Sequence, residues 1–336
     1  MRCENAQKPE EEQLEINSGR RPEALMSKLL IIKKGAAGDV LRTTVLLHLF
    51  SGWEVDWLVG RENLDLIRND LIRNQISDVH ALSPDKVYDL VICLEDETEL
   101  LVDVFSRIKW RRIFGSYVEG TQVRYTPDSA EWFDLGRISK HGIKKANELK
   151  FVNTKSYQEI LFNSLGFSFD GQRYVMPKKI ADSDLRGDIA VAPRAGQTWP
   201  AKDWYYFDRL TEDLSQEYTL NILPKRNTIL EHIADIKQHS FVISADSLPM
   251  HIAMGLGIPC AAFFTCTCPW EIYDYKLLTK IVSPRLKEYF YMREFSEDAA
   301  RAIPYDEALR IIHETLRVHT IEAKGIHQDI MVGQIR

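Results

Sequence analysis

The sequence predicts an α/β protein built from two successive doubly wound sheets. Short apolar runs alternate with segments whose apolar residues recur at helical spacing, and this alternation occurs twice along the chain. The polar stretch at 171–187 separates the two sets, and a length of 336 residues suits about two domains. We expect a mobile tail, an N-terminal domain, a C-terminal domain and a loose C-terminal segment at 1–27, 28–178, 179–318 and 319–336.

The first set of elements begins with an apolar strand that leads directly into an amphipathic helix. Val40, Leu41, Val45 and Leu49 recur at the spacing of one helix face. The strands of this set are predicted at 29–33, 53–59, 88–94 and 112–117. Its helices are predicted at 40–49, 63–68, 100–108 and 145–165, the last ended by Gly166.

The second set has the same alternation and ends in an amphipathic helix. Its strands are predicted at 188–192, 218–223, 241–244, 259–264 and 277–282. Its helices are predicted at 202–214, 228–237, 249–255 and 305–318. Strands connected by helices form parallel sheets, which bind ligands beyond the carboxyl ends of their strands. Two such sheets therefore predict a site in a cleft between the domains.

Composition excludes several classes of protein. The formal net charge of −6 argues against nucleic acid as a partner. The N-terminal segment lacks an apolar signal core, and no run of about 18 apolar residues occurs, so we expect a cytoplasmic protein. Cys266 and Cys268 are spaced too closely for a zinc knuckle and lack a nearby partner pair, so we expect no metal site.

The turn after the first strand is the first candidate site. Gly35 and Gly38 permit close backbone approach, and Asp39 falls in the first turn of the next helix. The spacing fits neither a nucleotide-binding P-loop nor a dinucleotide-binding turn. Asp39 is either a helix-stabilising carboxylate or a general base aimed into the cleft, and the spacing alone leaves both open.

The segment at 244–253 is the second candidate site. A strand ends, Asp246 and Ser247 offer helix caps, and Pro249 suits the first helical turn. A helix N-terminus beyond a parallel strand binds anions, and His251 lies where it could donate to a phosphate. A structural histidine is an equally good interpretation.

Two further loops follow strands of the second set. Arg194 could neutralise a diphosphate, or it could be a surface residue. Thr267 could bond a phosphate or a sugar, or it could cap the helix that starts near Pro269.

Taken together, these stretches resemble glycosyltransferase family 9, the ADP-heptose:lipopolysaccharide heptosyltransferases. The sequence Gly-Asp-Val-Leu at 38–41 resembles the family's opening turn. The sequence Asp-Ser-Leu-Pro-Met-His-Ile-Ala at 246–253 resembles its Asp-Thr/Ser-Gly-Pro-Met-His-Leu-Ala signature. The Trp199-Pro200 pair and the Thr267 loop follow in the family's order, and the likeness extends over roughly 28–318.

The resemblance implies a GT-B fold of two Rossmann-like domains and an inverting, metal-independent transfer of a sugar. Its donor would be a sugar nucleotide, ADP-heptose, with no other cofactor. Its acceptor would be a saccharide or glycolipid, which allows peripheral contact with the inner membrane face. The family's base falls on Asp39, and its donor site falls on Asp246, Ser247, His251 and Thr267, which Arg194 could assist.

Three features depart from the family pattern. Gln197 replaces a lysine two residues before Trp199, and Leu248 replaces a glycine after the Asp-Ser pair. The segment at 223–228 is too short for the family's extra helix and strand, so no ribose-binding carboxylate can be assigned, although Glu231 is near. These departures keep open a relative that binds a nucleotide sugar or glycan without transferring it. A dinucleotide-dependent oxidoreductase ranks third, because the sequence lacks its glycine fingerprint.

The basic stretch at 107–112 is the candidate acceptor contact. Arg111 and Arg112, beside Trp110, could hold an anionic glycolipid or the membrane face. A helix end with solvated cations explains the same residues equally well.

Overall fold

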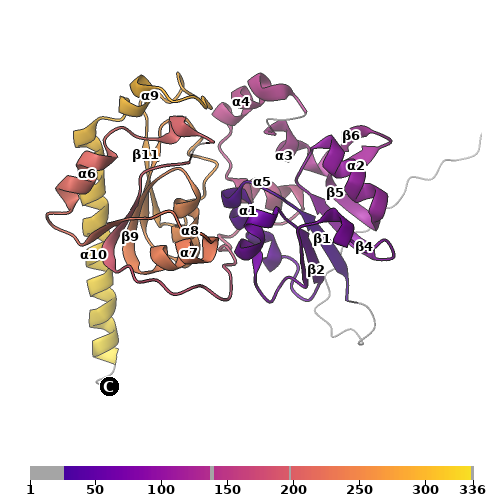
Figure 1. Cartoon of the computed structure of the whole chain (residues 1–336), viewed down its shortest axis with the longest axis horizontal. Coiled ribbons are helices and arrows are strands. Elements are labelled where there is room, and N and C mark those ends of the chain that lie inside the picture. Colours follow the sequence, from indigo (N-terminus) through magenta and orange to yellow (C-terminus); the bar gives the residue numbers. More distant parts are fainter. Residues whose placement is uncertain (1–25, 137–139, 197, 334–336) are drawn as a thin grey trace, which may run out of the picture.

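The computed structural model describes residues 26–136, 140–196 and 198–333, with side chains described up to His319. Two sheets lie side by side, each between helices (Figure 1). We call the part that contains the six-stranded sheet the first lobe and the part that contains the five-stranded sheet the second lobe. Of the tail predicted at 1–27, residues 1–25 lie outside the described residues.

The first sheet has the strand order β3-β2-β1-β4-β5-β6. Its strands are β1 (Lys28–Ile32), β2 (Glu54–Leu58), β3 (Asn74–Ile76), β4 (Val87–Cys93), β5 (Lys109–Glu119) and β6 (Gln122–Tyr125). All neighbouring strands pair in parallel except β5 and β6. The inner strands are nearly continuous apolar runs because helices cover both faces of the sheet.

The described helices of the first lobe are short, and the longest has 11 residues. They are α1 (Ala37–Thr43), α2 (Thr98–Arg107), α3 (Ala130–Asp134), α4 (Gly142–Val152) and α5 (Tyr157–Ser164), with 3₁₀ turns η1 (Thr44–His48), η2 (Arg61–Ile67), η3 (Val79–Ala81) and η4 (Pro127–Ser129). The single helix predicted at 145–165 is wrong, because α4 ends and α5 begins with a capping box. In it, Ser156 accepts from the amide of Glu159, and the Glu159 carboxylate accepts from the amide of Ser156.

The second sheet has the order β11-β10-β9-β7-β8, and all of its pairs are parallel. Its strands are β7 (Gly187–Ala192), β8 (Leu220–Ile222), β9 (His239–Ala245), β10 (Cys260–Phe264) and β11 (Leu278–Val282). Its helices are η5 (Pro200–Lys202), α6 (Phe207–Leu214), α7 (Ile229–Lys237), α8 (Leu248–Leu256), α9 (Glu297–Arg301) and α10 (Tyr305–Gly333).

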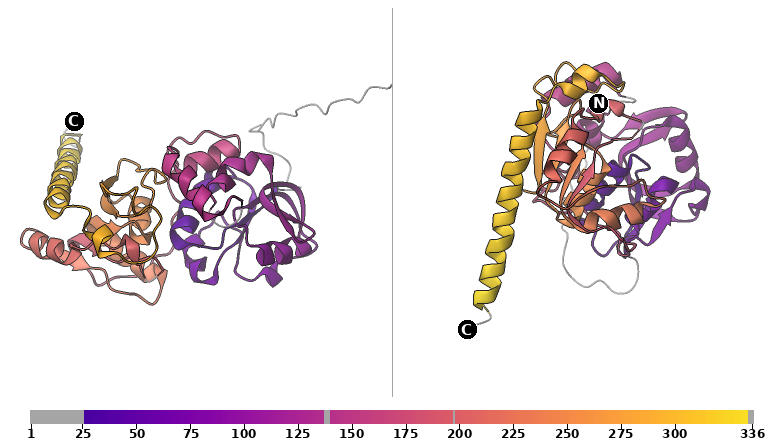
Figure 2. Two further views of the ribbon diagram at one scale, coloured as in Figure 1. Left: turned by 90° about the horizontal axis from the view of Figure 1, so that it is seen from above. Right: turned by 60° about the vertical axis from the view of Figure 1, so that its left-hand side comes forward.

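Two helices of the second lobe differ from the prediction. The helix predicted at 202–214 is split into η5 and α6, because Trp204 turns into the core and stacks on Phe263. The loose segment predicted at 319–336 is wrong as far as Gly333, because α10 continues to that residue. The extension contains no proline, and its Glu, Ala and Lys are good helix formers. Figure 2 shows α10 extending well beyond the body of the second lobe.

The chain crosses between the lobes in a connection without regular structure, from 167 to 186. The amide of Val175 donates to Thr44, in the first lobe. Further along, the Ser183 hydroxyl donates to Asp235 in the second lobe. The boundary predicted between 178 and 179 lies in this connection.

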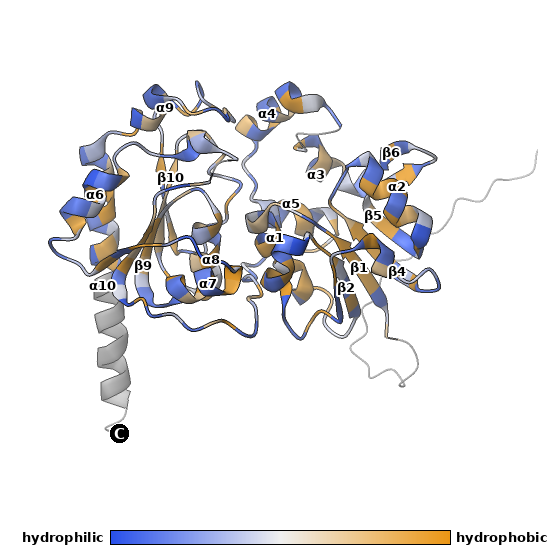
Figure 3. Ribbon diagram, in the orientation of Figure 1, coloured by the Kyte–Doolittle hydropathy of each residue, from blue (hydrophilic) through white to orange (hydrophobic). Residues whose placement is uncertain are grey.

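An apolar core joins the lobes. One buried cluster contains Leu29 and Ile31 of the first sheet together with Val242 and Met250 of the second lobe. Figure 3 shows hydrophobic residues along the central strands of both sheets, while the helices alternate between hydrophilic and hydrophobic residues. Helix α1, which follows β1, contacts helix α8, which follows β9.

Candidate active site

The turn after β1 lies where the first sheet changes direction. The connection from β1 leads to β2 on one side, whereas β4 lies on the other, and ligands bind at such switch points. Glu95, which follows β4, fastens this turn: its Oε1 accepts from Lys33 Nζ at 3.0 Å and from the Lys34 amide at 2.7 Å. The turn therefore presents the start of α1 in a fixed position.

Asp39 lies in the first turn of α1 and is paired with Arg42. Its Oδ1 accepts from Arg42 Nε at 3.1 Å and from Nη2 at 2.8 Å. The Arg42 guanidinium lies over the Tyr157 ring, 3.8 Å from its centroid. Within the described residues, the hydrogen bonds to this carboxylate all reach Oδ1, so Oδ2 keeps its lone pairs for an approaching hydroxyl group.

The charges around Asp39 keep it ionised. Burial alone would raise the pKa of Asp39, but the positive charges of Arg42 and Lys33 outweigh burial and hold that pKa below its ordinary value. The Asp39 side chain is 36% exposed, against 11% for Arg42. Asp39 is thus an accessible carboxylate that stays charged at neutral pH.

The turn after β9 lies at the corresponding point of the second sheet, where β7 and β9 are neighbours. Asp246 Oδ2 accepts from Lys202 Nζ at 3.0 Å and from Thr267 Oγ1 at 2.6 Å. Lys202 Nζ also donates to the Asp246 carbonyl at 2.8 Å. Burial would raise the pKa of Asp246, but the Lys202 charge and the Thr267 hydrogen bond hold it below its ordinary value.

The two turns meet where His251 of α8 packs against Gly38 of α1. A Cβ atom on Gly38 would lie 2.8 Å from His251 Cδ2 and 3.2 Å from Nε2, so only glycine leaves room for the imidazole. His251 is 5% exposed. Burial lowers its pKa to about 4, and the Arg42 charge acts in the same direction. The imidazole is therefore neutral at pH 7.

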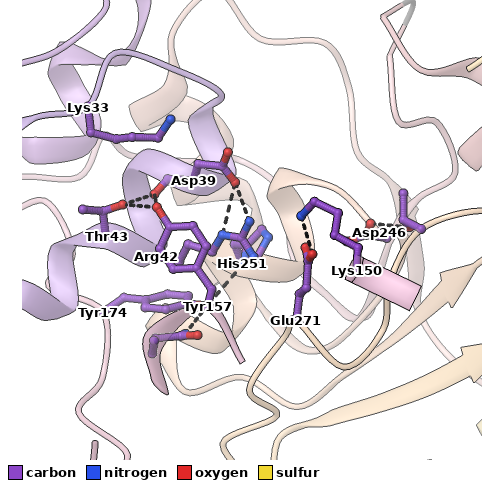
Figure 4. Close-up of polar contacts among 12 residues, drawn as sticks. Lys33, Asp39, Arg42, Thr43, Lys150, Tyr157, Tyr174, Asp246, His251 and Glu271 are labelled. Atoms are coloured by element: carbon purple, nitrogen blue, oxygen red, sulfur yellow. Dashed lines mark hydrogen bonds and ion pairs between the residues drawn. The ribbon is translucent and has the colours of Figure 1, made fainter. Parts of the chain in front are cut away.

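A buried ion pair also joins the lobes. Lys150 of α4 pairs with Glu271 of the second lobe, and both side chains are largely buried (Figure 4). The Tyr291 hydroxyl donates to Glu271 Oε2 at 3.2 Å, and the Tyr157 amide donates to the Glu271 carbonyl at 3.0 Å. These contacts hold α4 and α5 against the second lobe.

The other predicted donor-binding residues have weaker geometry. Ser247 is the N-cap residue of α8, but its hydroxyl donates to the Ala245 carbonyl at 3.3 Å rather than capping the helix. Arg194 is exposed and pairs with Asp203 at 3.3 Å. The cation next to Asp246 is Lys202 instead.

The basic residues of the predicted acceptor contact lie on β5. Arg107 ends α2, whereas Arg111 and Arg112 belong to the strand that follows it. Arg111 pairs with Asp89 at 3.5 Å and Arg112 with Asp128 at 3.6 Å. Both arginines remain exposed, and these ion pairs do not involve the Asp39 or Asp246 clusters.

Two of the departures from the family pattern, and Glu231 beside the third, have different outcomes. Leu248 is the first residue of α8 and is half-buried. Glu231 accepts from the Thr228 amide at 2.9 Å as part of a capping box, which accounts for its carboxylate. Gln197 lies outside the described residues.

The described residues contain no group of three or more His, Cys, Asp or Glu side chains arranged to hold a metal ion. Cys266 and Cys268 are buried, and burial raises the pKa of Cys266 to about 11. None of the described helices combines the length and apolar character needed to cross a membrane.

No protein-family model and no curated protein matches this sequence. Solved structures do match it. Escherichia coli ADP-heptose LPS heptosyltransferase II is 14% identical over 87% of this chain and 99% of that chain, with a TM-score of 0.57. A glycosyltransferase family 9 protein of Veillonella parvula DSM 2008 is 14% identical over 86% of this chain and 97% of that chain, with a TM-score of 0.54. E. coli heptosyltransferase WaaC with ADP is 16% identical over 86% of this chain and 99% of that chain, with a TM-score of 0.53.

The chain has the heptosyltransferase fold. The predicted GT-B-like architecture of two Rossmann-like units is therefore confirmed, because these structures match nearly their whole length. Within this heptosyltransferase fold, Asp39 and Asp246 each follow a central strand of one sheet.

Sequence reasoning missed three charged residues of the site, namely Lys202, Arg42 and Glu95. Lys202 lies three residues after Trp199, in the same loop as the predicted cation Arg194, so its position indicated a second candidate. Arg42 lies one helical turn after Asp39, a spacing typical of an ion pair. Glu95 gave no comparable signal, because its contact with Lys33 spans 62 residues.

Proposed function

We propose that this protein is an inverting, metal-independent glycosyltransferase that moves heptose from ADP-heptose to a saccharide or glycolipid acceptor. The observation that supports this most strongly is the meeting of two turns at Gly38 and His251. One turn holds an accessible carboxylate, and the other holds a helix N-terminus with a lysine. The shared fold supports an ADP-linked donor, because the similar structure of E. coli WaaC is a complex with ADP.

In the proposed reaction, Asp39 acts as the base. Its Oδ2 would accept the proton of the acceptor hydroxyl while the hydroxyl oxygen attacks the anomeric carbon. Arg42 would hold the carboxylate in position through Oδ1. The low pKa of Asp39 keeps it deprotonated, and it can accept the proton because the acceptor hydroxyl becomes more acidic as its oxygen bonds to the anomeric carbon.

The second lobe would stabilise the departing nucleoside diphosphate. The N-terminus of α8 is the positive end of the helix dipole and attracts negative charge. Lys202 directs two hydrogen bonds to Asp246, and an ammonium group has a third N–H that can reach a phosphate oxygen. These groups supply electrostatic stabilisation of the leaving group, the task that a metal ion performs in other transferases.

The test is a transfer assay with Asp39→Asn. The amide keeps the shape of the carboxylate but cannot accept the proton, so kcat should fall by roughly 10²–10⁴-fold. Asp65→Asn is the matched control, because Asp65 and Arg68 form an ion pair at the same spacing of three residues. Equal activity of the two variants would refute the role of Asp39.

The donor is tested by thermal shift with ADP, UDP, GDP, CDP and their sugar conjugates. A cognate donor near 100 times its Kd should stabilise the protein by about 2.7 kcal/mol. Selective stabilisation by ADP-heptose without turnover on any acceptor would favour a relative that binds without catalysis. Stabilisation by another base would retain the transferase and change the donor.

A glycolipid acceptor is favoured by the exposed basic strand β5. Arg111 and Arg112 are exposed beside the partly exposed ring of Trp110. Reversing both charges to glutamate should raise the acceptor KM and weaken binding to anionic vesicles. Arg124→Glu on the neighbouring β6 is the control, and unchanged KM and vesicle binding in the double variant would exclude this contact.

A further inference from the structure

His251 is connected to a buried chain of hydrogen bonds that comes from α5 and the connection between the lobes. The Tyr174 hydroxyl lies 3.3 Å from His251 Nδ1. Gln158 Nε2 donates to Tyr174 at 3.3 Å and to Tyr275 at 3.1 Å. The Tyr275 hydroxyl donates to the Gln172 carbonyl at 3.0 Å. All three side chains in contact with one another, Gln158, Tyr174 and Tyr275, are buried.

The direction of each hydrogen bond follows from one fixed acceptor. A carbonyl oxygen can only accept, so the Tyr275 proton is committed to Gln172 and the Tyr275 oxygen must accept from Gln158. This requires the amide nitrogen of Gln158, which then also donates to Tyr174. Within the described residues, His251 Nδ1 is the acceptor that remains for the Tyr174 proton.

The proton of the neutral imidazole is then on the other nitrogen. Nδ1 accepts from Tyr174, so Nε2 carries the hydrogen and becomes a donor. The edge of the ring that contains Nε2 faces Gly38, next to Asp39. No hydrogen bond to Nε2 is formed by the residues that the structure describes.

We propose that Tyr174, held by Gln158, is a positioning residue that fixes His251 as a neutral Nε2–H donor facing the site between the two turns. This rests on the proposed function only for its ligand, which would be a phosphate or sugar oxygen of the donor. A neutral donor can bond such an oxygen without competing with Lys202 for the charge of Asp246. The geometry and the hydrogen-bond directions stand without any assumed reaction.

Two further observations support the arrangement. Gln158 Oε1 is buried without a partner within the described residues. An unpaired buried oxygen is costly, and an apolar side chain would avoid that cost, so the stabilising part of this amide is its nitrogen with two hydrogen bonds. Burial also raises the pKa of Tyr174, so its hydroxyl keeps the proton that it donates.

The first experiment is ¹⁵N NMR of histidine-labelled full-length protein at pH 7.5, with the His251 signals assigned by their loss in His251→Asn. We expect Nε2 to be protonated and Nδ1 to be unprotonated. Tyr174→Phe should produce a mixture of both tautomers, and Gln158→Met should shift the same signals in the same direction. Tyr273→Phe is the control, because Tyr273 packs in the same aromatic cluster but not against His251.

The second readout is transfer. Tyr174→Phe should lower kcat roughly threefold to tenfold, the effect of about one neutral hydrogen bond, while Tyr273→Phe should not. Protonation at Nδ1 in the wild type, or an unchanged tautomer in Tyr174→Phe, would overturn the proposal. If no sugar nucleotide is transferred by the wild type, the proposed function fails, while the NMR result still decides the tautomer.

Discussion

His251 should make the stability of the protein depend on pH in a window that can be stated from its surroundings. An unfolded histidine has a pKa of 6.5, whereas burial and Arg42 lower the folded value to about 4. As the pH falls below 6.5, the unfolded chain binds the proton first and gains free energy that the native state does not. This contribution is therefore fully present above pH 6.5 and is lost as the pH approaches 4.

The magnitude follows from the difference of 2.5 pKa units, the step from 6.5 to 4. At about 1.36 kcal/mol per unit, the full loss is roughly 3 kcal/mol, of which about 2.5 kcal/mol is reached by pH 4.5. Solvent screening reduces this little, because His251 is 5% exposed. Asp39 and Asp246 have pKa values below 3.8, so they lose their stabilising effect only in more acidic solution.

The assay is urea unfolding at pH 7.5 and 4.5 of the wild type and of His251→Gln. The variant removes the titrating group, so the wild type should lose about 2.5 kcal/mol more than the variant between the two pH values. His232, whose pKa burial also lowers, contributes in both proteins and cancels in the comparison. His80→Gln, at an exposed position, controls for loss of an imidazole. Loss of equal stability by wild type and His251→Gln would refute the reasoning.

Three further substitutions test the packing and charge of the site. Gly38→Ala places a Cβ atom 2.8 Å from His251 Cδ2, so urea unfolding should show a loss of roughly 1–3 kcal/mol. Arg42→Gln removes the cation that lowers the pKa of Asp39, so the acid limb of the kcat/KM profile should move to higher pH. Glu271→Gln leaves its lysine partner on α4 buried without a counter-charge, so the free energy of unfolding should fall by roughly 3 kcal/mol.

Each of these substitutions has a matched control. Gly35→Ala adds a methyl group where no atom lies within 4 Å, so it should lower the free energy of unfolding less than Gly38→Ala does. Arg68→Gln removes an exposed cation that pairs with Asp65, and it should leave the pH profile of kcat/KM unchanged. Glu131→Gln breaks an exposed pair with Lys155 and should cost less than 1 kcal/mol, roughly the limit for surface pairs. A control that matches its test variant would contradict the corresponding prediction.

The sheets could be predicted from the sequence because their inner strands are continuous apolar runs. The strands predicted at 29–33 and 88–94 lie within one residue of β1 and β4. β3 and β6 were not predicted, because the first is three residues long and the second is a polar edge strand. A short or exposed strand forms through its neighbour's hydrogen bonds, which its own residues do not reveal.

The sequence could predict those site residues that directly follow a predicted strand. Asp39 and Asp246 were found in this way, and the structure places Thr267 and His251 beside them. The sequence restricts the partner of Asp246 to two cations of the loop after β7, Arg194 and Lys202, without choosing between them. The turn at η5 places Lys202, rather than Arg194, beside Asp246. This contact requires β7 and β9 to be neighbours in the sheet, which the local sequence does not reveal. The function of each predicted residue stays a prediction.

The two site carboxylates differ in exposure, and this difference distinguishes a catalytic base from a residue that positions a neighbouring side chain. Asp246 is 7% exposed, and its Oδ2 binds a lysine and a threonine of its own lobe. The Asp246 side chain is 10% exposed, so a substrate hydroxyl has little access to it. The Asp39 side chain is 36% exposed, and its bonds to Arg42 reach Oδ1 alone. An acceptor hydroxyl can therefore approach Asp39 without breaking a contact of the folded protein, and this favours Asp39 as the base and Asp246 as the residue that orients Lys202.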